Sequence, residues 1–220
     1  MRSNLPFTKT SASLPSSYVS GMIGHSEQGV DKYCELSGST PSQLKKVATP
    51  CIDDHHFSPN GFTEKGVLAS SAARIVLKCI YVAWHGRPDI CWSVNSLARE
   101  VRTWTIACDK RLWRLLSYIY CTTTRGLTRI VGNQVCDCKI ARYVESNFAG
   151  DLKDRKSASG YFLAVVGSNM CAPITWFCKK QTSVPRSSSE ADVIALDAGM
   201  RIEGIPSVVM WEQVLGVFIQ

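Results

Sequence analysis

Ten cysteines and four histidines are the residues of this chain that most directly suggest metal ligation or disulfide chemistry. Their spacing supports neither. Six cysteines occur singly, two are separated by one residue and two by six, so no pair has the spacing of a zinc ribbon. Cys51 with His55 and His56 comes nearest to a ligand cluster, but it has no second half. We therefore expect reduced, buried cysteines in an intracellular protein, of the cytoplasm or nucleus.

Two carboxylates occupy defined positions in predicted secondary structure. Glu145 lies in residues 140–148, whose alternation predicts a β-strand. Glu190 lies three residues after Ser187, a spacing typical of a capping box at the start of a helix. From residue type alone, Glu145 reads as a solvated strand residue and Glu190 as a capping carboxylate.

The composition describes an ordinary globular protein with an excess of positive charge. A chain of 220 residues is long enough for one large domain or two small ones. Its hydrophobic fraction of 45% and charged fraction of 20% argue against wholesale disorder. The formal net charge of +7 favours polyanionic partners. No stretch reaches the roughly 18 consecutive apolar residues of a membrane span, so no membrane partner is expected.

Residues 1–60 show little periodicity and many turn formers, which predicts a loosely ordered lead-in with one short structured patch. Within it, Asp53 and Asp54 have the paired carboxylates of a polymerase metal motif. The Tyr of that motif is absent, and Pro59 interrupts the hairpin on which the motif sits. We therefore do not expect polymerase activity from this pair.

Helical periodicity begins at Leu68 and defines three amphipathic helices. The first is expected to stop at Gly86, the second to be capped by Asp89, and the third to follow Asp109. Each helix needs the others to cover its apolar stripe. The sequence therefore predicts a helical packet within residues 61–130.

After the helical region, the apolar residues alternate with the two-residue period that is typical of β-strands. Strands are predicted over residues 140–148, 161–166 and 174–181. Their short polar connections favour an antiparallel meander. The helix capped at Ser187 follows, and Pro206 is expected to end or kink it.

Four sequence runs follow this order of elements. They are Tyr143-Val-Glu-Ser-Asn-Phe-Ala-Gly-Asp151, Arg155-Lys-Ser-Ala-Ser-Gly-Tyr161, Lys179-Lys-Gln-Thr182 and Ser187-Ser-Ser-Glu-Ala191. Together they resemble the ribonuclease H domain at the end of the Pol polyprotein of Copia-type retrotransposons. That family has Tyr-Ser-Asp-Ala-Asp-Trp-Ala-Gly-Asp, Arg-Lys-Ser-Thr-Ser-Gly-Tyr, Lys-Lys-Gln-Thr and Ser-Ser-Thr-Glu-Ala-Glu in the same order.

The resemblance extends into the helical region, and in all it covers about residues 42–216. The matching runs there are Gly86-Arg-Pro-Asp-Ile90, Ser93-Val-Asn-Ser-Leu97, Arg114-Leu-Leu-Ser-Tyr-Ile119 and Thr124-Arg-Gly-Leu127. They resemble the segment that connects the family's reverse transcriptase to its ribonuclease H domain. The resemblance implies an α+β fold, in which the helical packet of residues 61–130 precedes a truncated ribonuclease H-like domain at residues 138–220, with a three-stranded antiparallel meander plus helices.

The family cleaves the RNA strand of RNA–DNA hybrids with two Mg²⁺ ions that four carboxylates hold. By resemblance, Glu145 takes the place of the first carboxylate and Glu190 that of the second, so these are the implied catalytic and metal residues. The family has Asp where this chain has Glu145, and the added methylene disturbs a site that needs near-ideal geometry. The other two carboxylates are expected beyond the end of this sequence. We therefore expect an inactive enzyme that has lost its Mg²⁺ site, with no small-molecule cofactor.

Basic residues gather in the predicted strand loops, and either solvation or phosphate contact explains them. The candidates for contact with an RNA–DNA hybrid or another nucleic acid are Lys153, Arg155, Lys156, Lys179, Lys180 and Arg186. The alternative function is then a non-catalytic nucleic-acid-binding protein that retains the scaffold. A third hypothesis is an active nuclease whose other carboxylates come from elsewhere. The uncovered edge of the meander further predicts an aggregation-prone product.

Overall fold

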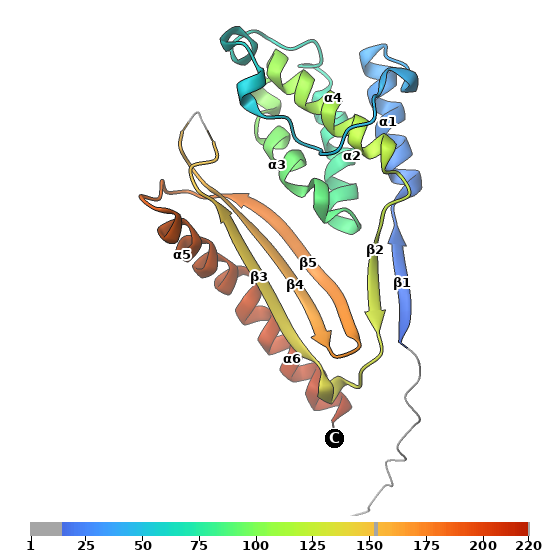
Figure 1. Cartoon of the computed structure of the whole chain (residues 1–220), viewed down its shortest axis with the longest axis vertical. Coiled ribbons are helices and arrows are strands. Elements are labelled where there is room, and N and C mark those ends of the chain that lie inside the picture. Colours follow the sequence, from blue (N-terminus) through green and yellow to red (C-terminus); the bar gives the residue numbers. More distant parts are fainter. Residues whose placement is uncertain (1–14, 152–153, 220) are drawn as a thin grey trace, which may run out of the picture.

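A packet of helices and a five-stranded antiparallel sheet occupy residues 15–151 and 154–219, which are the residues that this computed structural model describes (Figure 1). A long helical segment lies along one face of the sheet, and the helical packet meets the other face at one end. The α+β class predicted from the sequence is confirmed. Within the described residues, no helix is both long and apolar enough to cross a bilayer.

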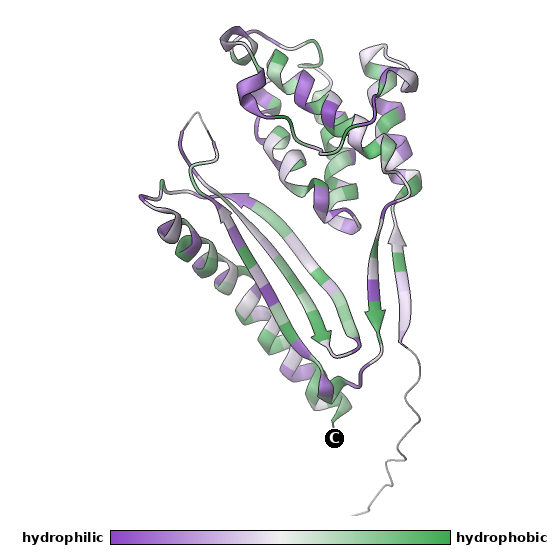
Figure 2. Ribbon diagram, viewed as in Figure 1, coloured by the Kyte–Doolittle hydropathy of each residue, from purple (hydrophilic) through white to green (hydrophobic). Residues whose placement is uncertain are grey.

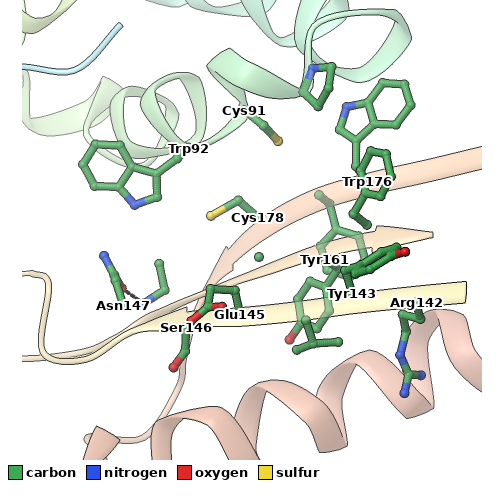
Figure 3. Close-up of a pocket in the computed structure, with 16 residues that line it drawn as sticks. Cys91, Trp92, Arg142, Tyr143, Glu145, Ser146, Asn147, Tyr161, Trp176 and Cys178 are labelled. Carbon is green, nitrogen blue, oxygen red and sulfur yellow. Dashed lines mark hydrogen bonds between the residues drawn. The ribbon is translucent and has the colours of Figure 1, made fainter. Parts of the chain in front are cut away.

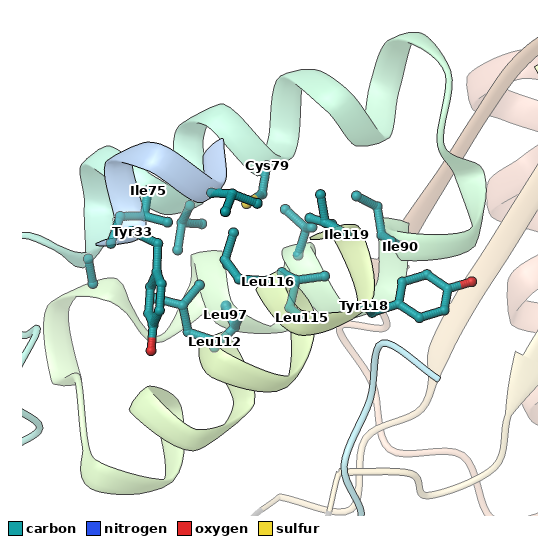
Figure 4. Packing of buried hydrophobic residues seen from close by; sticks show 14 of the residues in the cluster. Tyr33, Ile75, Cys79, Ile90, Leu97, Leu112, Leu115, Leu116, Tyr118 and Ile119 are labelled. Atoms are coloured by element: carbon teal, nitrogen blue, oxygen red, sulfur yellow. The ribbon is translucent and has the colours of Figure 1, made fainter. Parts of the chain in front are cut away.

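Four helices form the packet: α1 (Ile23–Ser37), α2 (Ala72–His85), α3 (Cys91–Arg99) and α4 (Ile106–Cys121). Helices α2 and α4 repeat apolar residues at intervals of three and four, which places them on one face of each helix. These faces meet in a core that is fully shielded from solvent (Figure 4). Its members include Ile75, Cys79, Val82, Leu112, Leu115, Leu116 and Ile119.

Helix α1 lies inside the segment for which the sequence predicted a loose lead-in. It packs against α2 and α4, and it buries Val30 and Tyr33. Its other buried positions, Ser26 and Gly29, are not hydrophobic side chains. The apolar pattern is therefore too sparse to indicate a helix. Tertiary contacts stabilise α1, although its local sequence does not predict it.

The starts of two helices differ from the predictions. Asp89 does not cap α3, because its carboxylate accepts hydrogen bonds from Arg87 instead. Helix α4 begins at Ile106, three residues before Asp109. The carboxylate of Asp109 bonds to the backbone N–H groups of Val67 (2.6 Å) and Leu68 (3.2 Å). Both acidic residues therefore serve tertiary contacts rather than the helix starts that were expected of them.

The predicted meander is confirmed. Strands β3 (Lys139–Asn147), β4 (Ala158–Gly167) and β5 (Met170–Lys180) pair antiparallel in succession. The sequence did not predict β1 (Ser16–Gly21) or β2 (Gly126–Val131), which extend the sheet in the order β1-β2-β5-β4-β3. These two strands bury none of their residues, so they lack the clear alternation of a half-buried strand.

The C-terminal helical segment consists of α5 (Ser188–Gly199), a π-helical turn (Met200–Gly204) and α6 (Ile205–Phe218). Ser187 caps α5 as predicted. Pro206 was expected to end or kink the first helix, but α5 ends before it. Pro206 instead lies in the first turn of α6, directly after the π-helical turn.

Candidate functional site

The two faces of the meander have different neighbours. Antiparallel partners share a face, so Tyr143, Phe162 and Trp176 lie in one row across the three strands. This row faces the helical packet, because the indole N–H of Trp176 donates to the carbonyl oxygen of Ala83 on α2 at 2.8 Å. The opposite face meets α5, where a Cβ atom on Gly199 would lie 2.7 Å from the Tyr161 ring.

A cleft of about 710 Å³ lies between α3 and the packet-facing side of the meander (Figure 3). Aromatic rings provide much of its lining. The Tyr143 and Phe162 ring centroids are 6.2 Å apart, and those of Phe162 and Trp176 are 6.4 Å apart. Trp92 contributes an indole from α3 on the other side of the cleft. The sequence did not predict this cleft, although the alternation of Tyr143, Glu145 and Asn147 on one strand indicated that they share a face.

Glu145 lies on β3 between Tyr143 and Asn147, and strand alternation therefore directs its side chain into the cleft. The residue is exposed. Within the described residues, its carboxylate has no hydrogen bond or ion pair. Glu145 thus has no polar partner among the described residues and lies beside aromatic rings.

Glu190 lies in the first turn of α5, as predicted. Its backbone N–H donates to Ser187 Oγ at 3.1 Å, and its own Oε2 accepts from the Arg186 N–H at 2.6 Å. Glu190 is therefore a helix-capping carboxylate.

The structure does not bring Glu145 and Glu190 together. Helix α5 covers the face of β3 opposite to the cleft, as the hydrogen bond from Ser146 Oγ to Asp192 (2.5 Å) demonstrates. Within residues 15–151 and 154–219, no group of three or more His, Cys, Asp or Glu side chains is placed to hold a metal ion. A two-Mg²⁺ centre would require several such carboxylates to converge on one point.

The predicted basic residues divide into paired and unpaired groups. Lys180 forms ion pairs with Asp151 (2.5 Å) and Asp154 (2.8 Å). Burial alone would lower the pKa of Lys180, but its hydrogen bonds and attraction to the two carboxylates outweigh burial and raise the pKa. Its charge is therefore neutralised by neighbouring residues.

The remaining basic candidates differ in exposure and in the segments that carry them. Arg155 and Lys179 are exposed, and Lys156 is half-buried in the loop beside Lys180. Arg186 is exposed just before α5. Lys153, also predicted to contact nucleic acid, lies outside the described residues.

All ten cysteines are free thiols. Cys79, Cys91 and Cys108 are buried, whereas Cys121, Cys136 and Cys171 are exposed, so the expectation of buried cysteines holds only for some. Burial raises the pKa of Cys178 in the cleft to about 11, so it is a neutral thiol at physiological pH. Cys51 donates to or accepts from Ser93 and belongs to no metal cluster among the described residues.

The motif Gly86-Arg-Pro-Asp-Ile90 builds a buried network whose role the sequence did not reveal. Arg87 is 2% exposed. Its guanidinium donates two hydrogen bonds of 2.9 Å to Asp89, and it also donates to the carbonyl oxygen of Thr122 at 3.0 Å. Tyr118 donates to the same Asp89 carboxylate at 2.9 Å. The network joins the entry of α3 to the end of α4, which is a structural role.

Comparison with known proteins relates the chain to transposon proteins. It is 35% identical over 106 residues to the "Retrovirus-related Pol polyprotein from transposon RE1" of Arabidopsis thaliana, which is 48% of this chain and 7% of that protein. It is 28% identical over 176 residues to the "Retrovirus-related Pol polyprotein from transposon TNT 1-94" of Nicotiana tabacum, which is 75% of this chain and 12% of that protein.

A third relative has a different name. The chain is 32% identical over 110 residues to the "Secreted RxLR effector protein 161" of Plasmopara viticola, which is 50% of this chain and 72% of that protein. No protein-family model and no solved structure matches the chain. The chain spans only 7% and 12% of the two Pol polyproteins. These similarities support a fragment of a retrotransposon Pol polyprotein, because the chain matches a short part of several proteins of that name.

Proposed function

We propose that the chain derives from the connection segment and ribonuclease H domain of a Copia-type Pol polyprotein, and that it does not cleave RNA–DNA hybrids. The names of its relatives and the order of its elements support this origin. The observation that carries the proposal is the placement of Glu145 and Glu190, which occupy the expected elements but belong to opposite sides of the sheet.

The metal requirement of phosphodiester hydrolysis supports the proposal that the chain is inactive. Two Mg²⁺ ions about 4 Å apart require several carboxylates that converge on one point. Glu145 faces the cleft under α3, whereas the Glu190 carboxylate accepts the Arg186 N–H at 2.6 Å. This difference in surroundings supports the proposal that the two carboxylates do not share a metal ion.

A cleavage assay tests the proposal. The purified chain is incubated with a labelled RNA–DNA hybrid and Mg²⁺, with Glu190→Gln and Glu145→Asp variants in parallel. We expect no cleavage above the buffer control from any of the three proteins. Cleavage by the unaltered chain that disappears in Glu190→Gln would overturn the proposal, since a contaminating nuclease would not respond to that change.

A second candidate function is binding to nucleic acid without cleavage. The net charge of +7 and the exposed Lys179 and Arg186 favour it. Such binding would weaken steeply with salt and depend little on base sequence. Replacing one contacting residue should reduce the slope of log affinity against log salt by about 1.

The ion pairs of Lys180 provide a matched control for this experiment. We expect Lys179→Gln and Arg186→Gln to weaken binding to a labelled hybrid, measured by fluorescence anisotropy. The double variant Lys180→Gln/Asp154→Asn should leave affinity nearly unchanged, because it removes an ion pair without changing the net charge. Equal losses in all three variants would contradict direct contact by the unpaired residues.

A further inference from the structure

The floor of the cleft contains a hollow above Gly160. This glycine lies on β4, between Glu145 on β3 and Cys178 on β5. Among the described residues, a Cβ atom on Gly160 would meet only the backbone oxygen of Glu145, at 3.9 Å. The sheet therefore leaves a space one side chain wide between a carboxylate and a thiol.

Aromatic rings border this hollow on two sides. Tyr143 precedes Glu145 by two residues and lies on the same face of β3, in the row that continues with Phe162. Trp92 projects from α3 toward the part of the cleft that holds Glu145 and Asn147 (Figure 3). Tyr143 is 59% exposed and Trp92 is 40% exposed, so both rings have faces available to a ligand.

The lining of the hollow carries a negative charge, although the net charge of the whole chain is positive. Two charged side chains line the cleft, Arg142 and Glu145. Arg142 lies on the other face of β3, where its guanidinium contacts the sulfur of Met200. Glu145 is thus the charged side chain of the lining that faces the hollow, while Arg99 at the end of α3 acts electrostatically on the Cys178 thiol.

We propose that the hollow above Gly160 binds a compact organic cation, a quaternary ammonium group, between Glu145 and the faces of Tyr143 and Trp92. The face of an aromatic ring is electron-rich, so it attracts a cation within about 6 Å of its centre. A nearby carboxylate adds direct charge attraction. An anionic ligand such as a nucleotide fits less well, because its phosphate would be repelled by the Glu145 carboxylate. The site requires neither Mg²⁺ nor a hybrid, so it stands apart from the proposed function.

Calorimetric titration of the full chain with choline tests the charge requirement. The matched neutral compound is 3,3-dimethylbutan-1-ol, which has the same shape without the charge. At about 0.15 M salt, the remote positive charges of the protein are screened over roughly 8 Å and do not mask a local effect. We expect choline to bind at least tenfold more tightly than the alcohol. Equal binding of the two compounds would overturn the proposal.

Variants test the position of the site. Glu145→Gln should weaken choline binding at least tenfold, whereas Glu212→Gln on α6 should not change it. Trp92→Ala should weaken binding, and Trp84→Ala, on an exposed part of α2, serves as its control. Unchanged affinity in Glu145→Gln, or binding of Mg²⁺ without choline, would contradict the proposal.

Gly160→Val supplies an independent measurement, because the open space above Gly160 accepts a side chain. We expect the variant to keep its melting temperature and to lose choline binding. Retained binding in a folded Gly160→Val protein would place the cation elsewhere and overturn the proposal.

Discussion

At the scale of single residues, the buried guanidinium of Arg87 needs an ion pair and hydrogen bonds to offset the cost of burying its charge. A buried charge is tolerated only when it is paired and its donors are satisfied. Asp89 accepts two of those donors, and Thr122 accepts others through its carbonyl and hydroxyl oxygens. The planar fork of an arginine matches this arrangement, whereas a lysine cannot reproduce it.

We expect Arg87→Ala to lower the free energy of unfolding by about 3–5 kcal/mol, because it leaves the Asp89 carboxylate without its partner. Urea denaturation measures the loss. Arg74→Ala is the control, since Arg74 is exposed on α2 and should cost less than about 0.5 kcal/mol. Similar losses in the two variants would show that the buried network contributes little.

The same pair predicts how stability responds to acid. Burial alone would raise the pKa of Asp89, but the hydrogen bonds and charge of Arg87, together with Tyr118, outweigh it and lower the pKa below the ordinary value of 3.8. A carboxyl with a lowered folded-state pKa stabilises the protein above its unfolded-state pKa, and this contribution is lost as pH falls through the folded-state value.

The melting temperature should therefore fall as pH is lowered from about 5 to about 3. The fall should be smaller in Asp89→Asn, which has no carboxyl to titrate at this position. Differential scanning calorimetry across this range checks the prediction. Parallel curves for the two proteins would assign the acid sensitivity to other carboxyl groups.

At the scale of elements, α6 is rich in apolar residues along its length (Figure 2). Several of them are exposed, including Ile205, Val208, Val209, Val217 and Phe218. Glu212 is the only charged residue of this helix. Apolar surfaces of this kind favour association, which adds to the edge strand as a reason for the predicted aggregation.

We expect the chain to self-associate with increasing concentration, and Val209→Lys to reduce this association. Light scattering over a concentration series measures the effect. Leu77→Lys is the control, because Leu77 is a 63% exposed residue of α2 in the helical packet. If Leu77→Lys reduced association as much as Val209→Lys, α6 would not be the contact surface.

At the scale of the whole molecule, β5 joins the sheet to the helical packet. Trp176 donates from its indole to Ala83, whose carbonyl belongs to the last turn of α2 and lacks a helical partner. Asn95 on α3 donates to the carbonyl oxygen of Cys178 at 3.1 Å. The packet and the sheet are thereby coupled through a central strand.

We expect one cooperative unfolding transition, with far-ultraviolet circular dichroism and tryptophan fluorescence changing together. Trp176→Phe should lower the free energy of unfolding by about 1–3 kcal/mol, because the carbonyl of Ala83 loses its buried donor. Trp92→Phe is the control within the same cleft. Two separated transitions in the unaltered chain would contradict the coupling.

The sequence predicts the elements that have a local periodic pattern of apolar residues, and it misses the elements that depend on contacts between distant residues. The meander and the cap at Ser187 follow from local alternation and spacing. Strands β1 and β2 have no buried face, so their pairing leaves no pattern to read. The positions of Glu145 and Glu190 along the chain were predictable, but their separation by the sheet depends on which face α5 covers.

The π-helical turn of Met200–Gly204 has one more consequence, for the orientation of everything after it. A wider turn adds about one residue to the winding, and each residue advances a helix by about 100°. The turn therefore sets the rotational phase of α6 relative to α5. Ordinary helical winding through the same five residues would rotate the α6 side chains by roughly a quarter of a revolution, whereas deleting one residue from the turn would let ordinary winding keep their present orientation.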